Sequence, residues 1–416
     1  MITLVNFITI VCGGLITYKT SKRILNGGIN LFGILVIIFF IFQHIPIIVG
    51  SFVEIRLSDW FFAPNIGKAL LDEKVAFVYD IYITVVIYIL YKLSKKEDDY
   101  LKFYIDRLHT IRFNSLINII LMLCMFSPIV GVLYAPEPSI YLKWAYFYRY
   151  SPLIIEELYH EEVMKDLLLL SLGSSLIFYS QKSNRSIITY IVIALVTWLS
   201  FKRTLLVFGS ALVLFFDLIQ NRYSNRSRQL LKKTILVLVI CVGYFVYYAI
   251  NSEKVSAASS VYVTYTMYFS REYSVKVAIL DLLNESKMLA YSGQSILFDL
   301  FFYVPRSFWP EKPIMYTKYL TTYCQGFTLD NISSTNFYGN IWAESLSNFN
   351  FFGIFYAFFV LFVIKRISEK SNNIAIYFLG NIFLIFYFFW CVQGFTIFII
   401  SFWTILLLLK RIKIIK

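Results

Sequence analysis

Charged residues are scarce in this chain. Asp, Glu, Lys and Arg make up 15% of its 416 residues, whereas a soluble domain carries about 25%. Hydrophobic residues reach 59%, and the mean hydropathy is +0.68. Apolar runs of about 20 residues recur along the chain, and each is long enough to cross a hydrocarbon core of about 30 Å. The composition excludes a soluble domain and predicts an all-α polytopic membrane protein.

Histidine and cysteine are also few, and they are scattered. The three histidines, His44, His109 and His160, are far apart, and the five cysteines form no CxxC pair. A metal site or a disulfide framework needs such residues at close, regular spacing. The GxxxxGK[ST], GxGxxG, HExxH and GxSxG motifs of nucleotide-binding proteins and hydrolases are absent as well. We therefore expect no metal, and a substrate that already resides in the membrane.

The apolar runs predict about eleven transmembrane helices. The first run, ITLVNFITIVCGGLITY, has neither the basic start nor the small-residue cleavage site of a signal peptide, so we expect a retained helix. The predicted spans are 2–18, 30–50, 75–92, 114–134, 164–180, 186–200, 204–220, 234–251, 348–364, 374–391 and 395–409. The whole chain, 1–416, is expected to form a single integral membrane domain.

Positive charge is in excess, with a net charge of +13, and it gathers in the loops between predicted spans. Basic residues collect on the cytoplasmic side of membrane proteins, so the excess calls for no nucleic-acid partner. The pattern predicts an outer N-terminus and an inner C-terminus. It leaves two long outer loops, about 135–163 and about 252–347. Most lysines and arginines lie at 19–23, 92–113, 181–185, 221–233, 365–373 and 410–416.

The larger predicted outer loop, 252–347, carries both signs of charge and many aromatic residues. This composition favours a folded, functional segment over a disordered tether. Apolar residues recur at near-helical spacing from Val261 to Leu283, interrupted by Arg271, Glu272 and Lys276. The spacing predicts an amphipathic helix along the outer leaflet. A solvated helix face with a local Arg–Glu pair is the alternative.

The same loop contains YVPRSFWPEKP at 303–313, where three prolines fall within eleven residues. Proline fixes its own φ and ends a helix, so the segment is predicted to form a stiff turn. Such a turn would hold Arg306 and Lys312 in defined places as a preorganised cationic clamp, and Trp309 suits the headgroup layer. A plain turn that returns the chain to the membrane explains the same residues.

Two further polar clusters lie beside predicted spans. Lys202 and Arg203 stand between two apolar runs on the predicted outer side, where the positive-inside bias disfavours them. An arginine fork there suits phosphate oxygens, although both cations can also simply extend to lipid headgroups. In the first outer loop, RYSPLIIEELYHEEVMKD sets His160 among glutamates. This cluster can supply a general base, and a wet acidic helix face is the alternative.

With these features, the chain resembles the Wzy-type oligosaccharide repeat-unit polymerases, which build O-antigen and capsular polysaccharides. The resemblance rests on the layout of spans with two long outer loops and on four motifs. These are the Lys-Arg-Thr step at 202–204, SREY at 270–273, VPRSFWPEKP at 304–313 and ESLSNFNFFG at 344–353. Some members have an Arg-Gly pair in a late outer turn, where this chain has Gln393 and Gly394.

The resemblance implies a membrane glycosyltransferase, similar to the GT-C type, in the bacterial cytoplasmic membrane with its active site outward. It implies transfer of a growing glycan from undecaprenyl diphosphate to a sugar hydroxyl of another lipid-linked repeat unit. No nucleotide-sugar and no cofactor is expected. The implied partners are the lipid-linked oligosaccharide, a chain-length regulator and a flippase.

Residue roles follow from the resemblance together with the charge pattern. Glu272 is the first candidate for the base that activates the acceptor hydroxyl, ahead of His160 and Glu311. The residues expected to bind the diphosphate are Arg203, Arg271, Arg306 and Lys312, and those expected to contact lipid or sugar are Tyr273 and Trp309. The alternatives are an O-antigen ligase, a flippase or other transporter of lipid-linked oligosaccharide, and a non-enzymatic scaffold.

Overall fold

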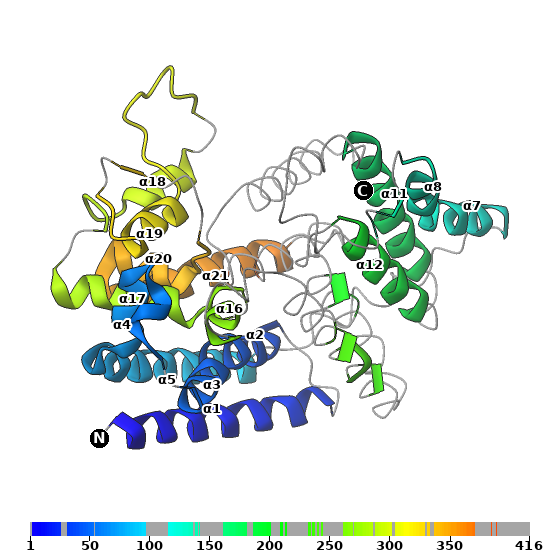
Figure 1. Ribbon diagram of the computed structural model, residues 1–416. Coiled ribbons are helices and arrows are strands. Elements are labelled where there is room, and N and C mark those ends of the chain that lie inside the picture. The colour runs from blue at the N-terminus through cyan, green and yellow to red at the C-terminus, as the bar shows by residue number, and fades with distance from the viewer. Residues whose placement is uncertain are drawn as a thin grey trace. The chain divides into compact units, whose positions relative to one another are not determined.

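The computed structural model describes the chain in segments. They are residues 2–25, 31–53, 55–96, 115–135, 138–139, 141, 161–180, 186–200, 209–210, 213, 232–233, 235–237, 239–240, 243, 261–268, 270–285, 288–301, 304–328, 331–332, 337–370, 384 and 388. Every regular element in these segments is a helix (Figure 1). The all-helical fold class is confirmed for the described residues.

Five helical stretches are long and apolar enough to cross a membrane, which indicates a multi-pass membrane protein. They are Leu4–Ile24, Leu31–Ser51, Glu73–Lys95, Ser115–Leu133 and Ile341–Arg366. Each overlaps a predicted span. The predicted spans 164–180 and 186–200 are helical too, as α11 (Glu161–Ser180) and α12 (Ser186–Ser200). The other four predicted spans lie mostly outside the described residues, so the count of eleven stays a prediction.

The chain divides into two compact units. Unit 1 comprises Met1–Ser21, Leu31–Glu97 and Ser259–Lys416, and unit 2 comprises Lys22–Asn30 and Asp98–Ala258. In unit 2, α11 packs against α12, α7 (Ser115–Met125) and α8 (Ser127–Leu133). The indole Nε1 of Trp198 on α12 donates to the carbonyl of Tyr141 at 2.7 Å, which joins this helix to a residue that follows α8 in the chain.

Unit 1 has a large apolar core, and α17 runs through it between α5 and α20 (Figure 1). Trp342 on α20 is buried and meets the rings of Phe39 and Phe358 edge to face. The helices of this unit are α1 (Ile2–Leu25), α2 (Leu31–Phe39), the π-helix η1 (Phe40–His44), α3 (Ile45–Ser51), the 3₁₀ turn η2 (Leu57–Trp60), α4 (Pro64–Leu71), α5 (Glu73–Lys96), α16 (Val261–Tyr268), α17 (Glu272–Asn284), α18 (Gln294–Leu300), α19 (Tyr316–Cys324), α20 (Ile341–Phe349), the 3₁₀ turn η4 (Asn350–Phe352) and α21 (Gly353–Lys370).

The second apolar helix is interrupted by the π-helical turn η1 just before Pro46. Proline has no N–H, so it cannot donate to the carbonyl four residues earlier, which is that of Phe42. This carbonyl instead accepts the backbone N–H of Arg271 at 3.2 Å. Because Pro46 cannot donate, the carbonyl of Phe42 is available to hydrogen-bond the chain just before α17.

The stretch from Val261 to Leu283 differs from its prediction. It is not one amphipathic helix but two helices, α16 and α17, separated at Ser270 and Arg271. Every residue of α17 from Glu272 to Asp281 is buried, including its charged side chains. The prediction of an interfacial helix was wrong here, because helical spacing of apolar residues also suits a helix packed on all sides.

Candidate functional site

A pocket of about 330 Å³ opens between six helices of unit 1. It lies at the N-terminal ends of α1 and α5 and at the C-terminal ends of α3 and α4, with walls from α16 and α17. Its polar lining residues are Asn6, Ser51, Asp72, Glu73, Glu272 and Lys276. In the topology predicted from charge, these helix ends face outward. The same predicted topology therefore puts the pocket on the outer side.

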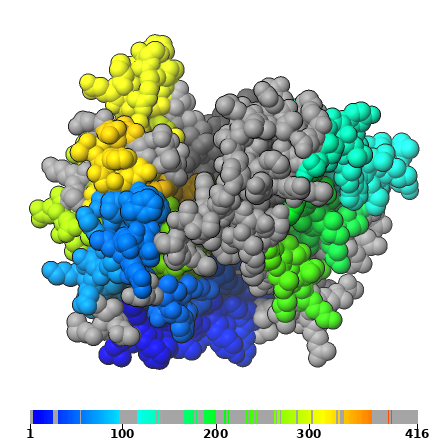
Figure 2. Space-filling model, viewed as in Figure 1, coloured from blue at the N-terminus to red at the C-terminus, as the bar shows by residue number. Residues whose placement is uncertain are grey.

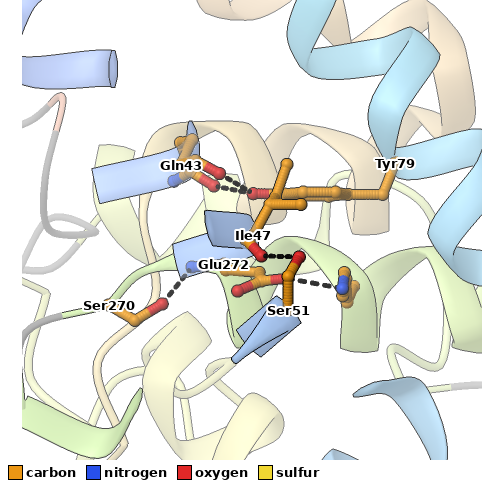
Figure 3. A network of polar contacts seen from close by, with 7 residues as sticks. Gln43, Ile47, Ser51, Tyr79, Ser270 and Glu272 are labelled. Atoms are coloured by element: carbon orange, nitrogen blue, oxygen red, sulfur yellow. Dashed lines mark hydrogen bonds and ion pairs between the residues drawn. The ribbon is translucent and has the colours of Figure 1, made fainter. Parts of the chain in front are cut away.

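An ion pair on α17 forms one wall of the pocket. Lys276 Nζ lies 2.5 Å from Glu272 Oε1, one helical turn away, and both residues are buried. The helix begins here because the hydroxyl of Ser270 accepts the backbone N–H of Glu272 at 3.1 Å (Figure 3). A side-chain oxygen at this place satisfies a donor that the first helical turn leaves open. The start of the helix thereby fixes where Glu272 points.

Side chains of the membrane helices support the ion pair from the other side. Lys276 Nζ lies over the ring of Tyr79, 5.1 Å from its centre. The hydroxyl of Tyr79 contacts both the carbonyl and the side-chain oxygen of Gln43 at 2.8 Å (Figure 3). Asp80, also on α5 and buried, interacts electrostatically with both members of the pair. The pair therefore belongs to a network of polar side chains from α17, α5 and η1.

The carboxylate of Glu272 retains capacity to accept a hydrogen bond. Its Oε1 binds Lys276, while its Oε2 is buried and has no hydrogen-bond partner in the described part of the chain. An ionised carboxylate accepts on both oxygens. Burial, and then the negative charge of Glu272, raises the pKa of Tyr262, which also lines the pocket. The pocket thus offers an acceptor, an ammonium group and a protonated phenol.

Arg271 and Tyr273, the neighbours of Glu272, make contacts elsewhere in the protein. The Arg271 guanidinium donates to the carbonyl of Ser270 at 2.8 Å and lies 5.4 Å from the centre of the Tyr338 ring. The hydroxyl of Tyr273 donates to the carbonyl of Tyr338 at 2.7 Å, and its ring is fully buried. Their predicted roles toward diphosphate and toward lipid or sugar stay predictions.

The predicted turn is present over its described residues, 304–313, and is closed by its own cations. Arg306 donates to the carbonyls of Pro310 and Pro313 at 3.3 and 3.2 Å, and Lys312 Nζ donates to that of Val304 at 2.9 Å. Trp309 meets the edge of Phe301. The segment between α18 and α19 projects from the rest of unit 1 (Figures 1 and 2).

Arg306 is exposed, so most of its donors stay open to solvent or to a ligand. Its guanidinium group makes two hydrogen bonds to carbonyls of the turn. A guanidinium group carries five N–H donors in all. Burial, followed by the charge of Arg306, lowers the pKa of Lys312. Glu311 is exposed on the same turn. Lys312 itself is buried, so Arg306 is the cation that this turn exposes, and none of these residues lines the pocket.

The structure places some of the predicted site residues and does not describe others. Glu272 is at the pocket, while His160 and Arg203 lie outside the described residues. Sequence reasoning did not assign a role to Lys276 or to Asp80. Both carried a usable signal: Lys276 follows Glu272 at the spacing of one helical turn, and Asp80 is an acid inside a predicted span.

Within the described part of the chain, no group of three or more His, Cys, Asp or Glu side chains is arranged to hold a metal ion. The titratable groups that line the pocket are carboxylates, an ammonium group and a phenol. These groups suit proton transfer and the binding of hydroxyls and anions. No protein-family model, curated protein or solved structure matches this chain.

Proposed function

We propose that this protein is a membrane glycosyltransferase that polymerises lipid-linked oligosaccharide repeat units at the outer face of the bacterial cytoplasmic membrane. The observation that carries the proposal is Glu272, a buried carboxylate with one open oxygen, in a pocket at the predicted outer ends of apolar helices. The resemblance of the chain's motifs to Wzy-type polymerases supplies the substrate class.

In the proposed reaction, the hydroxyl oxygen of the acceptor sugar attacks the anomeric carbon of the donor glycan. The bond from that carbon to the diphosphate oxygen breaks, and the polyprenyl diphosphate leaves with the electron pair. The hydroxyl proton passes to Glu272, which acts as general base. Lys276 binds Oε1 of Glu272 at 2.5 Å, which leaves Oε2 of the carboxylate to accept the proton.

The leaving diphosphate gains negative charge, and cations held in place lower the activation free energy of the bond cleavage. Arg306 and Lys312 are the candidates, because the turn that carries them is already ordered by contacts to its own carbonyls. A preorganised group loses little conformational entropy on binding.

The pocket volume of about 330 Å³ lies at the lower end of the range for small-molecule sites, about 300–1,000 Å³. This size suits the end of a glycan rather than the whole lipid-linked unit.

The test is complementation of a strain that lacks the gene, read as a glycan ladder on a gel. The wild-type gene should restore the ladder. Glu272→Gln should leave a single repeat unit on the acceptor when its level in the membrane is matched to that of the wild-type protein. The matched control is Glu285→Gln, which changes an exposed carboxylate just after the same helix and should restore a full ladder.

The same assay separates the other functions and tests the turn. Polymer that accumulates on the lipid carrier in the deletion strain would identify a ligase, and repeat units retained on the cytoplasmic face would identify a flippase. Arg306→Lys keeps the charge but loses the planar fork, so we expect shorter ladders with normal insertion. A fully active Arg306→Ala protein would refute the role of the turn.

A further inference from the structure

The segment that follows α3, residues 52–61, exposes large apolar side chains although it lies outside the apolar helices. Its described residues are 52–53 and 55–61, and they lie at the surface of unit 1 (Figure 2, mid-blue). Phe52 is 85% exposed and Phe61 is 77% exposed, and Val53 and Leu57 are exposed as well. None of these four side chains lines the pocket. Apolar side chains gathered at a surface mark a site of contact with a membrane or another molecule.

The 52–61 segment is fastened to the protein from behind. Trp60 is fully buried, and its ring centre lies 6.0 Å from that of Phe62. The N–H of Ala63 donates to the carbonyl of Trp60 at 2.9 Å. A Cβ atom at Gly67 would lie 2.8 Å from Cδ1 of Leu57, so α4 packs directly against the turn η2. The packing of Trp60 and of η2 therefore holds the neighbouring apolar side chains at the surface.

The position of the 52–61 segment in the chain identifies what covers it. The apolar stretch Leu31–Ser51, which is long enough to cross a membrane, ends immediately before Phe52. The next such stretch begins at Glu73. The chain between them therefore leaves the bilayer and enters it again on the same side. Apolar side chains that stand beside the end of a membrane-spanning helix lie at the depth where headgroups meet acyl chains.

The charged residues around the segment are distributed in the same sense. Arg56 and Lys68 are exposed and do not line the pocket. Asp72 and Glu73 do line it, and Asp59 is partly buried. Segments that lie in a membrane interface combine apolar side chains with lysine and arginine, whose cations bind lipid phosphates. The two cations outside the pocket suit that contact.

We propose that the 52–61 segment is an interfacial anchor that inserts Phe52, Leu57 and Phe61 into the lipid leaflet on the pocket's side of the membrane. In the topology predicted from charge, this is the outer leaflet. The occupant of the apolar surface is the bilayer itself, because the segment continues directly from a helix that spans it. The anchor does not depend on the proposed transferase reaction.

The anchor sets the height of the pocket relative to the membrane. Gly50, Ser51 and Ile55 line the pocket at one end of this connection, and Leu70 and Leu71 line it at the other. With the 52–61 segment inserted in the leaflet, the pocket lies at the level of the headgroups. A molecule attached to a lipid can then reach the pocket by moving within the leaflet, without first entering water.

The experiment measures tryptophan quenching in the full-length protein in lipid nanodiscs, with Phe52→Trp and Phe61→Trp as separate variants. Each adds one indole to the seven native tryptophans, so its signal is the difference from the wild-type protein. Lipids with brominated acyl chains should remove most of the added fluorescence, and aqueous iodide should remove little. Phe359→Trp, the same change at a 65% exposed position on α21, is the matched control within an apolar span and should respond alike.

Each other outcome refutes the anchor. Added fluorescence that iodide quenches and brominated lipid does not would place the segment in water. Fluorescence that neither agent quenches would show that a second copy or another protein covers it. A lipid-soluble diazirine, activated by light in the wild-type protein, gives a test without substitutions. Trypsin cuts after Arg56 and Lys68, and the peptide between them should carry the label on Leu57 or Phe61; labelling of α21 without this peptide would contradict insertion.

Discussion

At the scale of single residues, the buried pair of Glu272 and Lys276 is better explained by function than by stability. Moving a carboxylate and an ammonium group out of water costs several kcal/mol for each ion. Their mutual attraction repays this cost only with good geometry and further partners. Here Glu272 Oε2 has no such partner in the described residues. A pair of well-packed apolar residues would serve stability equally well.

This account predicts how the pair responds to substitution. Lys276→Met should lower the free energy of unfolding by about 3–5 kcal/mol, because it leaves the buried charge of Glu272 without a counter-ion. The double variant Glu272→Gln/Lys276→Met should recover most of that loss, since neither member of the pair then carries a charge. Thermal unfolding of the detergent-solubilised protein measures both. Equal losses in the single and double variants would show that the two side chains are not coupled.

At the scale of elements, the long apolar helices were predictable and the buried segment of the outer loop was not. The helix at Glu73–Lys96 was predicted at 75–92 because a continuous apolar run has one explanation in a membrane. α17 has a similar apolar spacing interrupted by charges, and such a pattern fits an interfacial helix and a core helix alike. Glu272 could be singled out as a candidate, but its pairing with Lys276 depends on which face is buried.

The contact between α1 and the second apolar helix gives a prediction at this scale. A Cβ atom at Gly13 would lie 2.4 Å from Cδ2 of His44, whereas one at Gly14 would meet nothing within 4 Å. His44 is fully buried and stacks on Phe40 with ring centres 5.3 Å apart, so it has little room to move. Gly13→Ala should destabilise the protein by about 1–3 kcal/mol through overpacking.

Gly14→Ala is the matched control for that substitution. It makes the same chemical change one residue later on the same helix, without the clash. Alanine favours a helix interior over glycine by up to about 1 kcal/mol, so this variant should be neutral or slightly more stable. Thermal unfolding midpoints of the two variants, measured side by side, give the difference. If Gly13→Ala were as stable as Gly14→Ala, α1 would not pack on His44 as described.

At the scale of the whole molecule, the proposed function requires the pocket to face outward, and the distribution of basic residues predicts that it does. α5 begins at the pocket with Glu73 and ends in the basic stretch that includes Lys95, so its two ends should lie on opposite sides of the membrane. In intact cells, a membrane-impermeant maleimide should label Glu285→Cys and should label Lys95→Cys only after permeabilisation. The unsubstituted chain, whose described cysteines Cys12, Cys124 and Cys324 are partly or fully buried, is the control for background labelling. The reverse pattern would turn the pocket toward the cytoplasm, where a polymerase of exported repeat units would not meet its substrate.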